Sequence, residues 1–115
     1  MKKLTIYHNP RCSKSREALA ILQERNCPIT TIEYLKKPLT TSQIKMLLAQ
    51  LKMKPIDMMR TKEPVFSDLK LSGSSTDAEL IKAMTENPIL IERPIVTDEK
   101  TAVIGRPPEN VLELL

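Results

Sequence analysis

The stretch from Leu4 to Leu22 reads LTIYHNPRCSKSREALAIL, and it decides the fold. Its first residues are apolar, β-branched or aromatic, which is typical of a short strand, and Pro10 ends that strand. Apolar residues then recur at helical spacing as far as Leu22, and Ser13 or Ser15 is available to cap the helix. We therefore expect Cys12 where a strand gives way to a helix N-terminus.

Cys12 is the first candidate for chemistry. The first N–H groups of a helix have no partner within it, and the helix dipole favours an anion, so a thiol placed there shifts toward thiolate. Arg11, Lys14 and Arg16 act in the same direction, and the same N–H groups can hold an oxyanion such as phosphate, sulfate or arsenate. The alternative is that Cys12 is a small buried apolar residue. Its polar, basic surroundings, with His8 upstream, favour a reactive thiolate.

Length and composition set broad limits on the class of protein. With 115 residues we expect one domain, residues 1–115, that buries roughly two-thirds of the surface of the unfolded chain. Two cysteines cannot form a disulfide framework, and the residues before His8 are too few for the apolar core of a signal peptide. No apolar run is long enough to cross a membrane. These features predict a soluble cytoplasmic protein in a reducing compartment, with no membrane partner.

The net charge of +4 suggests an anionic substrate or partner. We do not expect nucleic acid, because 18 basic residues are spread among 14 acidic ones and only Tyr7, Tyr34 and Phe66 are available to stack on bases. A mildly basic, solvated surface accounts for most of these charges.

The order of elements predicts an α/β fold: β-α-β, a helical insertion at about residues 39–92, then β-β-α. A second strand at 29–35 completes a βαβ unit with parallel strands, and 95–97 with 102–104 predict a hairpin, which together give a mixed four-stranded sheet. A last helix after Pro108 carries Val111, Leu112 and Leu115 on one side.

The insertion is predicted to be mainly helical. An amphipathic helix begins at Thr40, Thr41 or Ser42, and a short helix with proline at its first position covers 55–60. Turns and a loop are expected over 62–75, and a helix then begins at the capping box of Thr76 and stops at Asn87.

Three arginines lie at the ends of predicted elements. Arg60 ends the short helix, Arg93 precedes the third strand and Arg106 follows the fourth. Guanidinium groups bind tetrahedral oxyanions bidentately, so three of them converging on a thiolate would form a site for anion reduction or transfer. Taken singly, each arginine is better explained as a solvated surface residue, so the prediction rests on their convergence.

The chain offers no second thiol beside Cys12. Cys27 is fifteen positions away, and Ser15 occupies the place of the second cysteine of a Cys-x-x-Cys pair. A redox cycle would therefore need a thiol from glutathione or from a partner protein. Neither a metal site nor a nucleotide loop is expected, because no Cys or His stands at ligand spacing from Cys12 and the only glycines are Gly73 and Gly105.

His8 and Pro94 each allow two interpretations. As the only histidine, His8 either supports the Cys12 thiolate by charge or hydrogen bonding or simply caps the loop. The Arg93-Pro94 bond is trans by default, since only about 5–6% of X-Pro bonds are cis.

Several segments together resemble the glutaredoxin-linked arsenate reductase (ArsC) family, in particular its YfgD-like branch. These segments are HNPRC at 8–12, Arg60, NPILIERPIV at 87–96 and IGRP at 104–107. The resemblance covers nearly the whole chain, and it implies a thioredoxin-like fold with a helical insertion.

The resemblance also implies an activity, the glutathione- and glutaredoxin-dependent reduction of arsenate to arsenite. Cys12 would be the nucleophile, with His8 lowering its pKa. Arg60, Arg93 and Arg106 would bind the oxyanion, and Pro94 would be a cis proline beside the thiol. The thiolate-supporting residues would be Asn9, Arg11, Ser13, Lys14, Ser15 and Pro94. Glutathione would be a co-substrate and glutaredoxin a partner, with no bound cofactor or metal.

Two alternatives stay open. This chain has Ser13-Lys14-Ser15 where arsenate reductases of the family usually carry Gly-Thr-Ser, so another oxyanion or a glutathione mixed disulfide is a possible substrate. Spx-like regulators share the fold, and a non-catalytic binding protein is the alternative from a different class. Ser15 argues against the Cys-x-x-Cys switch of those regulators.

Overall fold

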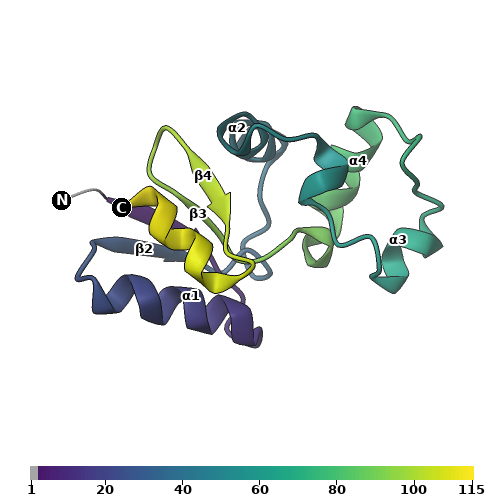
Figure 1. The fold of residues 1–115 in the computed structure, drawn as a ribbon. Coiled ribbons are helices and arrows are strands. Elements are labelled where there is room, and N and C mark those ends of the chain that lie inside the picture. The colour runs from purple at the N-terminus through teal and green to yellow at the C-terminus, as the bar shows by residue number, and fades with distance from the viewer. Residues whose placement is uncertain (1–2) are drawn as a thin grey trace. The chain divides into compact units, whose positions relative to one another are not determined.

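A computed structural model describes residues 3–115 and has the predicted order of strands and helices (Figure 1). The chain divides into two compact units, Met1–Lys37 with Arg93–Leu115, and Pro38–Glu92. The single domain with a helical insertion at about 39–92 stays a prediction. Met1 and Lys2, with which the N-terminal prediction begins, lie outside the described residues. Within residues 3–115, no helix is long and apolar enough to span a membrane.

The first unit is built on a mixed four-stranded sheet in the order β2-β1-β3-β4. β1 (Leu4–Tyr7) runs parallel to β2 (Ile29–Ile32) and antiparallel to β3 (Ile95–Thr97), which pairs antiparallel with β4 (Ala102–Ile104). The predicted βαβ unit and hairpin are confirmed. The second strand is shorter than predicted, because the chain turns at Glu33, whose carbonyl accepts the N–H groups of Lys36 and Lys37.

The core of this unit lies between the sheet and two helices, α1 (Ser13–Glu24) and the C-terminal η3 (Pro108–Leu114). Both helices lie against the strands of this unit in Figure 1, η3 as the yellow coil. Successive side chains of a strand point to opposite faces, so alternate residues of β1 enter the same core. The core residues are Leu4, Ile6, Ala18, Leu22, Val96, Val111 and Leu114. This arrangement is the thioredoxin-like α/β fold that the resemblance implies.

The C-terminal helix differs from its prediction. It is a 3-10 helix, and the residues that it buries are Val111 and Leu114, whereas Leu115 is 49% exposed. With three residues per turn, positions i and i+3 fall on the same side. The prediction that Leu115 lies on the buried side is therefore wrong, and Leu112 is half-buried.

The second unit is helical. It contains α2 (Thr41–Leu51), η1 (Pro55–Met58), α3 (Pro64–Asp68), α4 (Asp77–Glu86) and η2 (Pro88–Leu90). Thr40 caps α2 through a capping box with Gln43, and Thr76 caps α4 through the box with Glu79. These side chains satisfy N–H groups that have no partner within the helix.

One part of the insertion was predicted wrongly. The expected loop over 62–75 contains α3, a short helix with Pro64 at its first position. Of its five residues only Phe66 is buried. A helix anchored by one apolar side chain shows no periodicity for a sequence pattern to detect.

Gly105, just after β4, sits where a side chain would not fit. A Cβ atom there would lie 2.9 Å from Pro94 Cγ and 3.2 Å from Val111 Cγ1. Its N–H donates to the Pro94 carbonyl at 2.8 Å, so the two backbones are held together. At Gly73, in contrast, nothing lies within 4 Å of the Cβ position.

We expect Gly105→Ala to lower the free energy of unfolding by about 1–3 kcal/mol, because the new methyl group overpacks against Pro94 and Val111. Gly73→Ala is the matched control. It should leave stability unchanged or raise it by up to about 1 kcal/mol, since its space is open and neither glycine has a positive φ. Urea denaturation followed by circular dichroism measures both variants, and equal stabilities would contradict the close packing.

Candidate active site

Cys12 is the N-cap residue of α1. Its backbone is extended, with φ −92° and ψ 122°, and its carbonyl accepts the N–H of Arg16 at 3.0 Å. Its own N–H donates to the Asn9 carbonyl at 3.0 Å, which closes the turn after β1. The prediction that Ser13 or Ser15 caps this helix is wrong, because Ser13 is already the first helical residue and the Ser15 side chain is engaged elsewhere.

The Ser15 hydroxyl ties the helix to the turn that precedes it. It is fully buried, lies 2.6 Å from His8 Nδ1 and accepts the N–H of Asn9 at 3.1 Å. Because the oxygen already accepts from Asn9, its own proton is available for His8 Nδ1. These bonds fix the backbone on both sides of Cys12.

His8 is buried, with 6% of its surface exposed. Burial lowers its pKa, and Arg16 lowers it further, while Glu33 opposes them. The ring is therefore neutral at neutral pH, and its hydrogen bond goes to Ser15. His8 is not among the groups that lower the pKa of Cys12, so its support of the thiolate stays a prediction.

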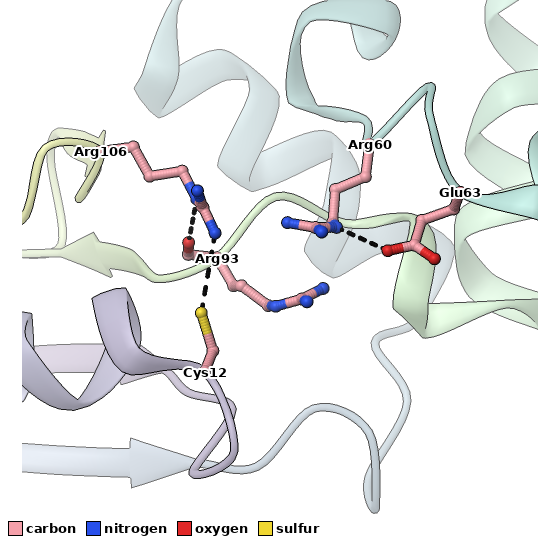
Figure 2. A network of polar contacts seen from close by, with 5 residues as sticks. All are labelled: Cys12, Arg60, Glu63, Arg93 and Arg106. Carbon is pink, nitrogen blue, oxygen red and sulfur yellow. Dashed lines mark hydrogen bonds and ion pairs between the residues drawn. The ribbon is translucent and has the colours of Figure 1, made fainter.

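Arg106, just after β4, reaches the sulfur, and Arg93, just before β3, lies next to Arg106 (Figure 2). Because Ile95 pairs with Ile104, the same register places Arg93 opposite Arg106 at the end of the hairpin. Arg106 donates from Nη2 to Cys12 Sγ at 3.7 Å and from Nε to the Arg93 carbonyl at 2.9 Å. The structure thus brings together two of the three predicted arginines with Cys12.

Opposing effects act on the Cys12 thiol. Burial raises its pKa, but the backbone N–H of Ser15, the guanidinium of Arg93 and the backbone N–H of Lys14 lower it and together prevail. The pKa of Cys12 therefore lies below its usual value, in the direction expected at a helix N-terminus. The thiolate is the nucleophilic form.

Two hydrogen-bond donors of the Arg93 side chain lack an acceptor. Its Nε and Nη1 are buried, and no group within residues 3–115 accepts a hydrogen bond from either. Burial lowers its pKa, but Cys12 and Tyr34 outweigh burial and raise it, so Arg93 is a cation. Buried charged donors without an acceptor are costly. An oxyanion beside the sulfur would supply the missing acceptors.

A cis proline and a buried tyrosine lie next to Arg93. The Arg93-Pro94 bond is cis, as the resemblance implied, and so is Arg106-Pro107. Tyr34 is fully buried and close enough to raise the pKa of Arg93. Sequence reasoning missed Tyr34, because an aromatic residue after a strand carries no signal about which side chain it meets.

The other residues predicted to support the thiolate lie in the turn after β1 and at the start of α1. Asn9 accepts the backbone N–H of Arg11 through Oδ1 at 3.0 Å, and the Arg11 side chain is exposed. Lys14 is exposed and forms an ion pair with Glu17 at 3.8 Å. Lys14 therefore acts on Cys12 through its backbone N–H, as described above.

Arg60 belongs to the second unit. Its N–H donates to the Leu90 carbonyl at 2.7 Å, next to the bridge between Met59 and Ile91. Its Nε donates to Glu63 Oε1 at 3.0 Å, which the sequence did not suggest (Figure 2). Backbone and side chain are thus both anchored. The binding of an oxyanion by Arg60 stays a prediction.

Cys27 lies beyond the other end of α1. It packs, partly buried, against the core of the first unit, and both cysteines are free thiols. The 12 residues of α1 span about 18 Å, far beyond the roughly 7 Å between Cα atoms that a disulfide allows. A redox cycle at Cys12 therefore requires an external thiol. Within residues 3–115, no three His, Cys, Asp or Glu side chains gather as metal ligands.

Comparison with known proteins adds independent evidence. The sequence model of the ArsC family matches residues 7–114. The chain is 47% identical to YfgD of Escherichia coli strain K12, over 99% of this chain and 98% of that one. It is 44% identical to an arsenate reductase of Haemophilus influenzae, over 96% and 97% of the two chains. Among solved structures, an arsenate reductase from Vibrio cholerae matches with a TM-score of 0.95 and 44% identity, covering 99% and 98%.

We expect Arg93→Gln to raise the pKa of the Cys12 thiol, because removing the cation leaves the thiolate less stabilised while burial still opposes it. The measurement is the pH dependence of Cys12 alkylation by iodoacetamide in a Cys27→Ser background. The midpoint should move to higher pH, and alkylation at pH 7 should slow.

Arg25→Gln, at the far end of α1, is the matched control and should keep the profile of the parent protein. Circular dichroism checks that both variants are folded. Coincident profiles for the Arg93 and Arg25 variants would show that Arg93 does not act on the thiol.

Proposed function

Because this chain belongs to the ArsC family, we propose that it is an arsenate reductase in which the Cys12 thiolate is the nucleophile. One observation supports the roles proposed for Cys12, Arg93 and Arg106. The sulfur of Cys12 accepts from Arg106 at 3.7 Å beside an Arg93 guanidinium whose buried Nε and Nη1 have no acceptor within residues 3–115. A nucleophile and unsatisfied cationic donors side by side suit attack on a bound oxyanion.

In the proposed first step, arsenate binds through its oxygens to Arg93 and Arg106, and the Cys12 thiolate attacks arsenic. A sulfur–arsenic bond forms, an arsenic–oxygen bond breaks, and the leaving hydroxyl takes up a proton to depart as water. The two guanidinium groups offset the negative charge of the oxyanion as its geometry changes. Ser15 and His8 act as positioning residues, since they hold the turn on which Cys12 lies.

In the proposed second step, glutathione supplies the electrons. Its sulfur bonds to the sulfur of Cys12, the sulfur–arsenic bond breaks, and its electron pair stays on arsenic, which leaves as arsenite. Arsenic(V) is thus reduced to arsenic(III) while two thiols become a mixed disulfide. Glutaredoxin then attacks this disulfide and restores the Cys12 thiolate. The distance along α1 to Cys27 supports an external reductant.

We also propose that the protein works in the bacterial cytoplasm. Both cysteines are free thiols, and a thiol that must return to its reduced state in every cycle requires a reducing compartment.

We expect Cys12→Ser to abolish arsenate-dependent NADPH oxidation in the presence of glutathione, glutaredoxin and glutathione reductase, with a loss of at least about a thousandfold. A hydroxyl at this position is neither ionised nor able to form the mixed disulfide. Cys27→Ser is the matched control and should retain turnover, because Cys27 only packs against the core.

Full activity of the Cys12 variant would refute the nucleophile. A wild-type protein that is inactive with arsenate, although its Cys12 titrates well below about 8.5, would refute the substrate and leave another oxyanion or a mixed disulfide in its place.

We expect Arg60→Ala to raise the KM for arsenate by about tenfold or more, because a charge-assisted hydrogen bond to the oxyanion would be lost. Lys62→Ala is the control, since Lys62 is exposed and lies close to Arg60 in the same segment. Steady-state kinetics at saturating glutathione compares the two. An unchanged KM for the Arg60 variant would remove this residue from the substrate site.

A further inference from the structure

A cavity of about 250 Å³ lies next to the Cys12 turn, within the first unit. Its walls are His8–Arg11, from the turn after β1, and Glu33, Leu35 and Lys36, from the turn after β2. β1 and β2 are parallel neighbours, so both turns follow the carboxyl ends of adjacent strands. Ligands of open α/β sheets bind at this edge. The proposed attack on arsenate does not use this cavity.

The walls of the cavity are held by hydrogen bonds. On one side the carbonyl of Glu33 accepts the N–H groups of Lys36 and Lys37, each at 3.0 Å. On the other side Asn9 Oδ1 accepts the N–H of Arg11 at 3.0 Å. A cavity between two such turns is largely formed before a ligand arrives, which lowers the entropic cost of binding.

The chemistry of the walls is mixed. Arg11 and Lys36 supply positive charge, and Glu33 supplies a carboxylate 3.5 Å from Lys36 Nζ. Leu35, which is 41% exposed, and Pro10 add apolar surface to the walls. A ligand that matches these walls carries carboxylate and ammonium groups joined by short aliphatic segments. Amino acids and small peptides have this composition.

The position of the cavity connects it with the redox cycle. Arg11 is the residue directly before Cys12, so their Cα atoms are about 3.8 Å apart. Since Cys27 cannot reach Cys12, the electrons must come from a second molecule that brings its own thiol close to this turn. A binding site for that molecule is expected nearby.

We propose that this cavity binds the charged backbone of a small peptide thiol, with Arg11 and Lys36 holding its carboxylate groups and Glu33 its ammonium group. The inference rests on the proposed function in so far as an external thiol completes the cycle. It identifies the residues that distinguish a peptide thiol from a simple one, which the proposed function leaves open.

Binding is tested first in the Cys12→Ser protein, where no disulfide can form at the site. The ¹⁵N-labelled protein is titrated with glutathione and, in parallel, with cysteamine, which has a thiol and an ammonium group but no carboxylate. Glutathione should shift the amide resonances of His8, Asn9 and Arg11 and of residues 33–36, and cysteamine should have a much smaller effect. Lys36→Glu should raise the dissociation constant for glutathione by about threefold or more.

Lys37→Glu is the matched control. Lys37 is the exposed neighbour of Lys36 and does not line the cavity, and its reversal changes the net charge by the same amount. This variant should bind glutathione like the parent protein. Equal dissociation constants for the Lys36 and Lys37 variants, or resonance shifts confined to other residues, would overturn the proposal.

Kinetics provides a second test in the active protein. Lys36→Glu should raise the KM for glutathione by a similar factor without changing the KM for arsenate, and Lys37→Glu should change neither. The binding test contains no arsenate, so it is independent of the substrate. Glutathione binding in the cavity without arsenate turnover would sustain this inference and refute the proposed function. Arsenate turnover with a KM for glutathione that is the same in the Lys36→Glu variant would support the proposed function and refute this inference.

Discussion

The electrostatic pairing of one sulfur with two guanidinium groups is the interaction on which the site depends. Burial alone would favour a neutral Cys12 and would disfavour a charged Arg93, yet each raises the stability of the charged form of the other. Removing one member of such a pair leaves the other charge desolvated without compensation. The first unit must therefore hold both partners within a few ångströms, and much of its local structure serves that requirement.

The turn after β1 and the β3-β4 hairpin together meet this requirement. The turn after β1 is closed by Cys12 and Asn9 and supported from inside by the Ser15 hydroxyl, which fixes the sulfur at the start of α1. The hairpin holds the cations. Its pairing continues from Ile95 and Ile104 through the bond between Gly105 and Pro94, so that Arg106 reaches both the Arg93 carbonyl and the sulfur.

Sequence reasoning succeeds where the signal is local. Short runs of apolar and β-branched residues predict β1 and the hairpin, the capping box predicts α4, and the break at Pro10 predicts that Cys12 begins a helix. The register that places Arg93 opposite Arg106 was not predicted and comes from the structure. Nothing local reveals that the guanidinium of Arg93 is buried with free donors or that it meets Tyr34, because both depend on how distant segments pack.

Ser15 shows why a local rule failed and what the failure means for the chemistry. Serine near a helix start is normally predicted to accept from the helix backbone, but here its hydroxyl is buried and bonds His8 and Asn9 in the preceding turn. In a Cys-x-x-Cys site this position carries the second thiol. A buried hydroxyl fixes the turn but cannot resolve a disulfide, so in the cycle proposed above the residue that positions Cys12 leaves its reduction to another molecule.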